Sequence, residues 1–399
     1  MQSLSLEMEL EGLLSESVDS AQKRRQSALT DILGEDVGPV VLFGAGLLGR
    51  QVLPFVKRVG LEPIAFIDNN PQLWGTLIDG VEVMAPAQLA QKYQGNLPSV
   101  IATIWSGRAP DRMRDRLGFL RDLGFKKIAL FGHLAWRFPE VFLPHYSLDV
   151  PEKALLQADD IRRAFKLISD EESRKLFVGH VRWRLLLDYD ALPSASDLEI
   201  YFDPKFMNEN KNEVLYDIGA FDGDTVVDFL RSGRGFQEIH AFEPSPRNFG
   251  KLQRRVAEIA GRGLKKIYPH QMAVGDTEGT IQVENDAGPA SRVGQGQETA
   301  AVSTLDRLVE KSATPTFIKM DIEGFEPQCL EGGRRVITEH APVLAVCVYH
   351  LQDHLWSLML KISEWHKGYE FSFCPHLNDG WDLVLYAVPK HRLPVDPKV

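Results

Sequence analysis

Two segments of this chain share one order of features: an apolar run, a glycine-rich turn, a stretch with helical spacing, and a second apolar run ending at an acidic residue. The first segment starts at PVVLF and ends at Asp68, and the second starts at VLYDIG and ends at Glu243. Apolar runs that alternate with helices of roughly ten to fifteen residues indicate parallel βαβ units. The sequence therefore predicts an α/β protein with two separate parallel sheets.

The length agrees with more than one domain. At roughly 150 residues per domain, a chain of 399 residues predicts two to three domains. We expect a helical arm at residues 1–35, a smaller Rossmann-like nucleotide-binding-type domain at 36–150, a helical bridge at 151–198 and a second α/β domain at 199–390. Residues 151–190 are predicted to form two helices, the first with Ala158, Ile161 and Phe165 on one face.

Composition and charge exclude several kinds of protein. Charged residues make up 25% and apolar residues 44%, as in ordinary globular proteins. The 45 basic and 55 acidic residues give a net charge of −10, which repels polyphosphate, so nucleic acid is not an expected partner. The three cysteines are far apart, which indicates neither a disulfide framework nor a zinc site.

Glu7, Glu9 and Glu11 interrupt the apolar residues near the N-terminus, where a signal peptide has an unbroken apolar run. No segment approaches the roughly 18 apolar residues of a membrane helix. We therefore expect a cytoplasmic protein without a membrane partner, while association into a homo-oligomer stays open.

The turn of the second sheet has the features of a cofactor site. Gly219 and Gly223 let the backbone turn sharply and let a ligand approach it, and Glu243 can accept hydrogen bonds from two adjacent ribose hydroxyls. Ser245 and Pro246 are also typical of a helix start, which accounts for them but not for Glu243. The predicted cofactor-binding residues are Asp217, Gly219, Ala220, Phe221, Asp222, Gly223, Asp224, Thr225, Glu243, Pro244, Ala273 and Asp321. Four of them, Asp217, Glu243, Ala273 and Asp321, are expected at the carboxyl ends of strands of this sheet.

Six motifs, in order over residues 199–388, resemble the FkbM family of S-adenosylmethionine-dependent methyltransferases. They are YDIGAFDGDT, HAFEPSP, STLD, KMDIEGFE, YHLQDHLW and DLVLYA. The resemblance implies a class I methyltransferase fold, in which a seven-stranded, mostly parallel sheet has an antiparallel final strand. It also implies S-adenosyl-L-methionine as cofactor and methyl transfer to a hydroxyl oxygen of a sugar, polyketide or similar metabolite. We expect the acceptor to be a small molecule such as a sugar or nucleotide sugar. Phe221 departs from the small residue that many methyltransferase loops have at this position.

Methyl transfer from a sulfonium is an in-line displacement, and a general base adds ~10²- to 10⁴-fold where a hydroxyl must lose its proton. Asp321 and Glu323 face the same way if their strand continues, and His350 follows another strand, with Asp353 placed to orient its ring. We therefore predict Asp321, Glu323 and His350 as catalytic residues. A first-turn acid at Glu323 and a structural His350 remain alternatives.

The spacing of His350, Asp353 and His354 also fits a metal site, and two close carboxylates can hold a divalent cation. Helical spacing of this kind is common by chance, so no metal is predicted. Tyr201, Phe202 and Asp203 precede the second sheet, where aromatic residues either close over a cofactor or join the core.

The turn of the first sheet predicts a nucleotide site. Gly44, Gly46 and Gly49 fit G-x-G-x-x-G between a strand and a helix, and Asp68 ends the next strand. This pattern predicts a phosphate on the helix N-terminus and a ribose on Asp68. The string FIDNNPQLWGTLIDGVEVMAPAQL is similar to Rossmann-like nucleotide-sugar-binding domains of sugar-modifying enzymes. A nicotinamide cofactor and a purely structural domain are the alternatives.

Two other functions compete with methyl transfer. A nicotinamide-dependent sugar-modifying enzyme would use the first sheet, but no Tyr-x-x-x-Lys pair lies near it. A non-catalytic protein that binds S-adenosylmethionine or a nucleotide sugar is the second, because only the placement of the acceptor separates binding from turnover.

Overall fold

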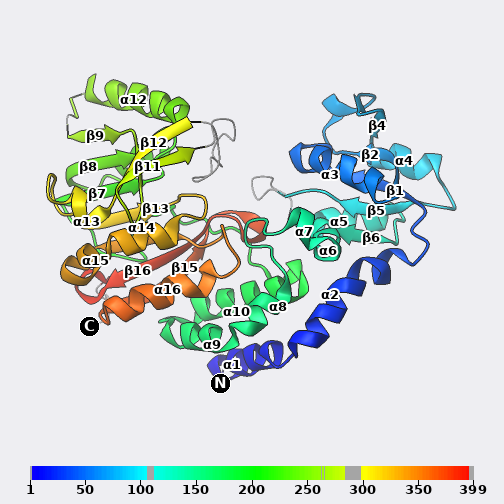
Figure 1. Cartoon of the computed structure of the whole chain (residues 1–399), viewed down its shortest axis with the longest axis horizontal. Helices are drawn as coiled ribbons and strands as arrows, with labels where there is room; N and C mark the ends of the chain where they lie inside the picture. The colour runs from blue at the N-terminus through cyan, green and yellow to red at the C-terminus, as the bar shows by residue number, and fades with distance from the viewer. Residues whose placement is uncertain (1, 106–111, 262, 265, 284–297, 395–399) are drawn as a thin grey trace. The chain divides into compact units, whose positions relative to one another are not determined.

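The computed structural model describes residues 2–105, 112–261, 263–264, 266–283 and 298–394 (Figure 1). The chain divides into two compact units. One consists of Met1–Ala158, Val178–Ser194 and Leu377–Trp381, and the other of Asp159–Phe177, Ala195–His376 and Asp382–Val399. Each unit contains its own sheet, as the two βαβ patterns predict.

The first unit has a six-stranded sheet in the order β3-β4-β2-β1-β5-β6, in which only β3 runs antiparallel to its neighbour. The strands are β1 Pro39–Phe43, β2 Glu62–Ile67, β3 Leu77–Ile78, β4 Val81–Met84, β5 Ser99–Ala102 and β6 Ile128–Leu130. Its helices are α1 Gln2–Leu14, α2 Val18–Leu33, α3 Leu47–Arg58, α4 Pro86–Lys92, α5 Met113–Asp122, α6 Phe131–Arg137, α7 Pro139–Phe142 and α8 Pro151–Leu156. The strand order reverses between β1 and β5, so a ligand is expected at the carboxyl end of β1.

The second unit has a seven-stranded sheet in the order β15-β16-β14-β13-β7-β8-β9. Its strands are β7 Glu213–Ile218, β8 Phe236–Phe242, β9 Ile267–His270, β13 Phe317–Met320, β14 Val343–Cys347, β15 Tyr369–Pro375 and β16 Leu383–Pro389. Only the final strand, β16, runs against its neighbours, which confirms the predicted fold class. The strand order reverses between β7 and β13, which places the expected ligand edge beside Asp217.

The remaining elements of this unit are α11 Asp224–Arg231, α12 Pro246–Gly261, α13 Leu305–Leu308, α14 Glu326–Gly332, α15 Arg334–His340 and α16 His354–Trp365, with β10 Met272–Val274, β11 Gly279–Val283 and β12 Glu298–Ser303. The last three strands form a separate small sheet. The prediction that Ala273 ends a strand of the main sheet is therefore wrong. The chain leaves β9 at His270, and β10 then pairs with β12.

The segment predicted to hold two helices after residue 150 holds three: α8, α9 Ala158–Leu167 and α10 Glu171–Leu186. Gln157 ends α8, and the short turn there had no glycine or proline to mark it. Ile161 and Phe165 are buried on one face of α9, as their spacing predicts.

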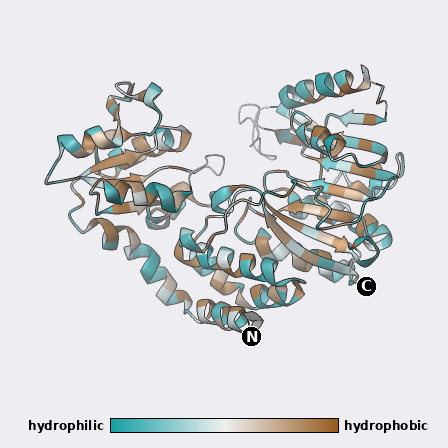
Figure 2. Cartoon of the chain, turned by 180° about the vertical axis from the view of Figure 1, so that it is seen from behind, coloured by the Kyte–Doolittle hydropathy of each residue, from teal (hydrophilic) through white to brown (hydrophobic). Residues whose placement is uncertain are grey.

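The core of each unit follows the hydropathy of its strands. Figure 2 shows the strands of both sheets as largely apolar, while hydrophilic residues gather on helices and connecting segments. Tyr201 and Phe202 are buried, so these aromatic residues join the core. Cys329, Cys347 and Cys374 are buried free thiols. Among the described helices, none has the length and apolar character needed to cross a membrane.

Candidate functional site

The turn after β7 is packed so closely that its glycines are required. Gly219 has a φ of +81°, and a Cβ there would lie 1.9 Å from the carbonyl oxygen of Asp321. Gly223, with a φ of +88°, precedes α11, and a Cβ there would lie 3.0 Å from Leu252. A left-handed backbone and close contact both favour glycine. The turn is thus fixed against the end of β13.

Glu243 holds this turn in place from the end of β8. Its Oε2 accepts a hydrogen bond from the Phe221 amide at 3.0 Å, and its Oε1 accepts one from the Ser245 amide at 2.9 Å. Burial raises the pKa of Glu243 to about 7, although both amide hydrogen bonds oppose that shift. Each carboxylate oxygen has a second lone pair, so Glu243 keeps acceptor capacity for a ligand hydroxyl.

Asp217 lies beneath the turn in an ion pair with Lys319. Its Oδ1 is 3.0 Å from Lys319 Nζ, and the two side chains are 0% and 2% exposed. Lys319 Nζ also donates to the Gly219 carbonyl at 2.6 Å. Because both side chains are buried, Asp217 is not accessible to solvent, and the pair acts by holding the turn in position through Lys319.

Of the other predicted cofactor residues, those from Ala220 to Thr225 belong to the same turn and the start of α11, whereas Pro244 and Asp321 follow β8 and β13. The Ala220 amide donates to the Phe242 carbonyl at 2.9 Å, and Asp222 pairs with Arg255 at 3.0 Å. Phe221 adopts a φ of +46°, with Lys251 Nζ 4.8 Å from its ring centroid. Asp224 and Thr225 begin α11, and Pro244 follows Glu243 directly.

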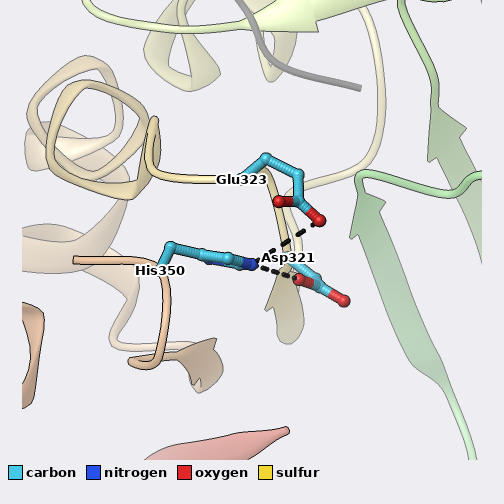
Figure 3. A group of neighbouring side chains, drawn as sticks. All are labelled: Asp321, Glu323 and His350. Carbon is cyan, nitrogen blue, oxygen red and sulfur yellow. Dashed lines mark ion pairs between the residues drawn. The ribbon is translucent and has the colours of Figure 1, made fainter. Parts of the chain in front are cut away.

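The three predicted catalytic residues come together beside this turn (Figure 3). His350 Nε2 lies 3.3 Å from Asp321 Oδ1 and 3.8 Å from Glu323 Oε1. Its Nδ1 lies 2.8 Å from Glu326 Oε1. The histidine side chain is 1% exposed, whereas Asp321 is 28% and Glu323 12% exposed. A buried ring is thus held between three carboxylates, two of which are partly open.

The carboxylates decide the charge of His350. Burial by itself lowers the pKa of this ring, but the charges of Glu326 and Glu323, together with its pairing to Asp321, raise its pKa well above the usual value. Burial raises the pKa of Asp321, but the His350 pairing and the Lys319 charge outweigh it and lower that pKa. His350 is therefore an imidazolium at neutral pH, with Asp321 ionised.

Two aspects of the predicted cluster need correction. β13 ends at Met320, and Glu323 has a left-handed φ of +55°, so the carboxylates meet through a tight turn and not through a continued strand. Asp353 does not orient His350, because it stands at the N-terminus of α16 while Glu326 pairs with the ring. His354, weighed as a metal ligand, has its Nδ1 3.4 Å from Glu326 Oε2.

Tyr349, Glu326 and Lys319 were missed, and Tyr201 was considered only as a residue that closes over the cofactor or joins the core. Tyr201 and Tyr349 donate to the two oxygens of Asp321 at 3.5 and 3.4 Å. Glu326 and Lys319 are the buried partners of His350 and Asp217. The role of Lys319 could have been predicted from the sequence, because a lysine in an apolar central strand needs a buried acidic partner. Its register partner on β7 is Asp217.

Asp321, Glu323 and His350 can also hold a metal ion. One ligand atom from each lies within 4.8 Å of the others, which makes them a candidate cation site among the described residues. Carboxylate oxygen and imidazole nitrogen together suit several divalent ions.

Comparisons with known proteins cover both units. Residues 217–373 match the family described as the Methyltransferase FkbM domain. The crystal structure of the methyltransferase FkbM from Methylobacillus flagellatus KT has a TM-score of 0.76 at 19% identity, covering 96% of this chain and 100% of that chain. This likeness shows a shared fold over nearly the whole length.

More distant structures include an rRNA methylase from Streptococcus thermophilus, with a TM-score of 0.30 at 11% identity, covering 45% of this chain and 89% of that one. Fibrillarin from Aeropyrum pernix, solved with S-adenosyl-L-methionine, has a TM-score of 0.28 at 13% identity, covering 45% and 67%. Likenesses this weak do not bear on function. No curated protein matches the chain.

Proposed function

We propose, from the premise that residues 217–373 are a methyltransferase domain of the FkbM family, that the chain moves a methyl group from S-adenosyl-L-methionine to a hydroxyl of a sugar, nucleotide sugar or related small metabolite. The observation that carries this proposal is the pair of partly open carboxylates, Asp321 and Glu323, held by a buried histidine beside the glycine turn.

The residues of the turn fit the cofactor. A sulfonium cofactor carries a positive charge and a ribose with two adjacent hydroxyls. Glu243 supplies a carboxylate with free lone pairs, and Gly219 lets a ligand approach the backbone without a side chain in the way. Asp321 and Glu323 supply negative charge near the same turn. When bound, S-adenosylmethionine supplies an electrophilic methyl group.

The acidic cluster then serves the acceptor. Asp321 is a weak base, because its pKa is lowered and its oxygens accept bonds from Tyr201 and Tyr349. It is suited to orient the acceptor hydroxyl. Glu323, held in a left-handed turn, accepts the proton that the hydroxyl loses. The His350 imidazolium keeps both carboxylates in position and is not itself the base.

A methyl-transfer assay with radiolabelled S-adenosylmethionine and a panel of sugars and nucleotide sugars tests this function. We expect label to appear on one acceptor hydroxyl, and nuclear magnetic resonance of the product identifies an O-methyl group. Tight cofactor binding without transfer to any acceptor of the panel would favour the non-catalytic alternative.

Cofactor affinity should depend on the ionisation of Glu243. Because the pKa of Glu243 is about 7, its carboxylate form is complete above that pH and is lost as the pH falls through it. Affinity should therefore weaken roughly tenfold from pH 8 to pH 6, and calorimetry measures it. Glu243→Gln should bind about 10- to 100-fold more weakly at pH 8 and lose this pH dependence.

Two comparisons make that result specific. Ionisation of the cofactor itself affects both proteins, so the difference between their pH slopes reports Glu243 alone. The exposed Glu258→Gln should keep the wild-type slope. Equal slopes for wild type and Glu243→Gln would refute the ribose assignment.

Chelation of divalent ions should leave methyl transfer unchanged. The reason is that a protonated His350, with Nε2 3.3 Å from Asp321 and 3.8 Å from Glu323, already supplies positive charge to these carboxylates. Turnover is compared before and after dialysis against ethylenediaminetetraacetate. Activity that disappears and returns with Mg²⁺ or Mn²⁺ would show instead that these three residues bind a metal.

A further inference from the structure

The first unit contains a cavity whose lining residues have been given no role in methyl transfer. It has a volume of about 470 Å³, which is within the range of small-ligand sites. It lies at the carboxyl end of β1, where the strand order of the sheet reverses. Its lining includes Gly44, Gly46, Asp68, Thr103, Trp105 and Arg116.

The glycines of this turn divide into two kinds. Gly44 has a φ of +110°, and a Cβ there would lie 2.8 Å from Ile104, while a Cβ on Gly49 would lie 2.0 Å from the Gly44 carbonyl oxygen. These two are needed for packing. Gly46 has extended backbone, and nothing lies within 4 Å of the position of its Cβ. Its missing side chain leaves open space in front of the turn.

The start of α3 faces this space without a side-chain cap. Gly46 is the N-cap residue of this twelve-residue helix, and no side chain among the described residues accepts a hydrogen bond from its first amides. Uncapped amides and the positive end of the helix dipole favour an anion.

Arg116 provides a second, independent indication of an anion. This residue of α5 is 7% exposed and lines the cavity, and its Nη1 has no hydrogen-bond partner among the described residues. Burial raises the pKa of the nearby Asp379, although its bond from the Met113 amide, at 2.8 Å to Oδ2, and the charges of Arg112 and Arg116 oppose that shift. Trp105 Nε1 is a further buried donor without a partner in the described chain. Buried donors of this kind call for an acceptor-rich ligand.

Asp68 repeats the arrangement of Glu243. Its Oδ2 accepts from the Ala45 amide in the turn, and its Oδ1 accepts from the Asn70 amide two residues on, both at 2.8 Å. Glu243 makes the same two kinds of bond in the other sheet. Both carboxylates keep lone pairs toward the ligand edge, where ribose hydroxyls can donate.

We propose that this cavity binds the diphosphate of a nucleotide, such as a nucleotide sugar, with the phosphates on the start of α3 and Arg116 and the ribose on Asp68. The amides at the start of α3 and the Arg116 guanidinium can donate hydrogen bonds to the phosphate oxygens, and the Asp68 carboxylate can accept hydrogen bonds from the ribose hydroxyls. This proposal does not depend on the proposed methyl-transfer function, and the experiments below test it independently.

Calorimetry with UDP, UDP-glucose, NAD⁺ and uridine tests the proposal on the full chain. UDP should bind and uridine should not, because uridine lacks the phosphates. Tighter binding of UDP-glucose than of UDP would support a nucleotide sugar, and binding of NAD⁺ alone would support the phosphate site with a different nucleotide. Failure of UDP, UDP-glucose and NAD⁺ to bind at millimolar concentration would overturn the proposal.

Two variants locate the site. Arg116→Met should weaken UDP binding about 10- to 100-fold by removing charged hydrogen bonds. Gly46→Val should abolish it by filling the open space, and extended backbone accepts valine. Arg114→Met and Gly118→Val, on the same helix as Arg116, are matched controls that should bind like wild type. Circular dichroism and retained S-adenosylmethionine binding check folding. UDP affinity that survives both test variants would overturn the assignment.

Discussion

Glu323→Gln should reduce methyl transfer by about 10²- to 10⁴-fold, the effect expected for loss of a general base. The amide keeps the shape of the side chain but cannot take the proton of the acceptor hydroxyl. Single-turnover kinetics with saturating cofactor measure the chemical step, and calorimetry should show that S-adenosylmethionine still binds, since Glu243 holds the ribose.

The exposed Glu339→Gln is the matched control and should react at the wild-type rate. Asp321→Asn should also slow transfer, because it removes the group that orients the acceptor. If Glu323→Gln retains its rate while Asp321→Asn loses it, the two roles are reversed. Near wild-type rates in both variants would remove the cluster from the mechanism.

Lys319→Met should lower the free energy of unfolding of the second unit by about 3–5 kcal/mol, the cost of leaving a buried charge without its partner. Asp217 is 0% exposed and has Lys319 Nζ at 3.0 Å, so methionine would leave its carboxylate isolated among apolar strands. Hydrogen exchange of β7 and β13 peptides in urea measures the stability of this unit without a contribution from the other.

A double variant distinguishes a lost charge pair from a general packing defect. Asp217→Asn combined with Lys319→Met removes both charges of this pair and should recover most of the lost stability. The exposed Lys311→Met should change stability very little. A double variant that is less stable than Lys319→Met alone would contradict the proposed role of the pair.

The placement of two acidic residues beside the glycine turns could be predicted from the sequence, because it follows from the pattern of parallel strands. Asp68 and Glu243 each follow a strand next to a glycine turn, and in a parallel sheet the carboxyl ends of neighbouring strands lie at one edge. The structure places each beside its turn, with an amide of that turn as a donor. Binding roles for these residues stay predictions.

Ala273 shows where this reasoning fails. Its segment has the apolar character of a strand, and the prediction placed it in the main sheet. The chain instead leaves that sheet one residue before β10, and the new partner, β12, lies beyond residue 297. Apolar character identifies a strand, but it does not identify the neighbour with which the strand pairs.

What the sequence determined was the alternation of strands and helices, the two glycine turns and the acids at strand ends, because these depend on spacing within short segments. The tertiary structure alone decided the charge of His350. Its partner Glu326 is 24 residues away, and the left-handed turn at Glu323 brings a further carboxylate to its ring. Enclosed among acids, a histidine that resembled a neutral base in the sequence becomes a cation, because a pKa depends on the charges and burial around a group and not on its neighbours along the chain.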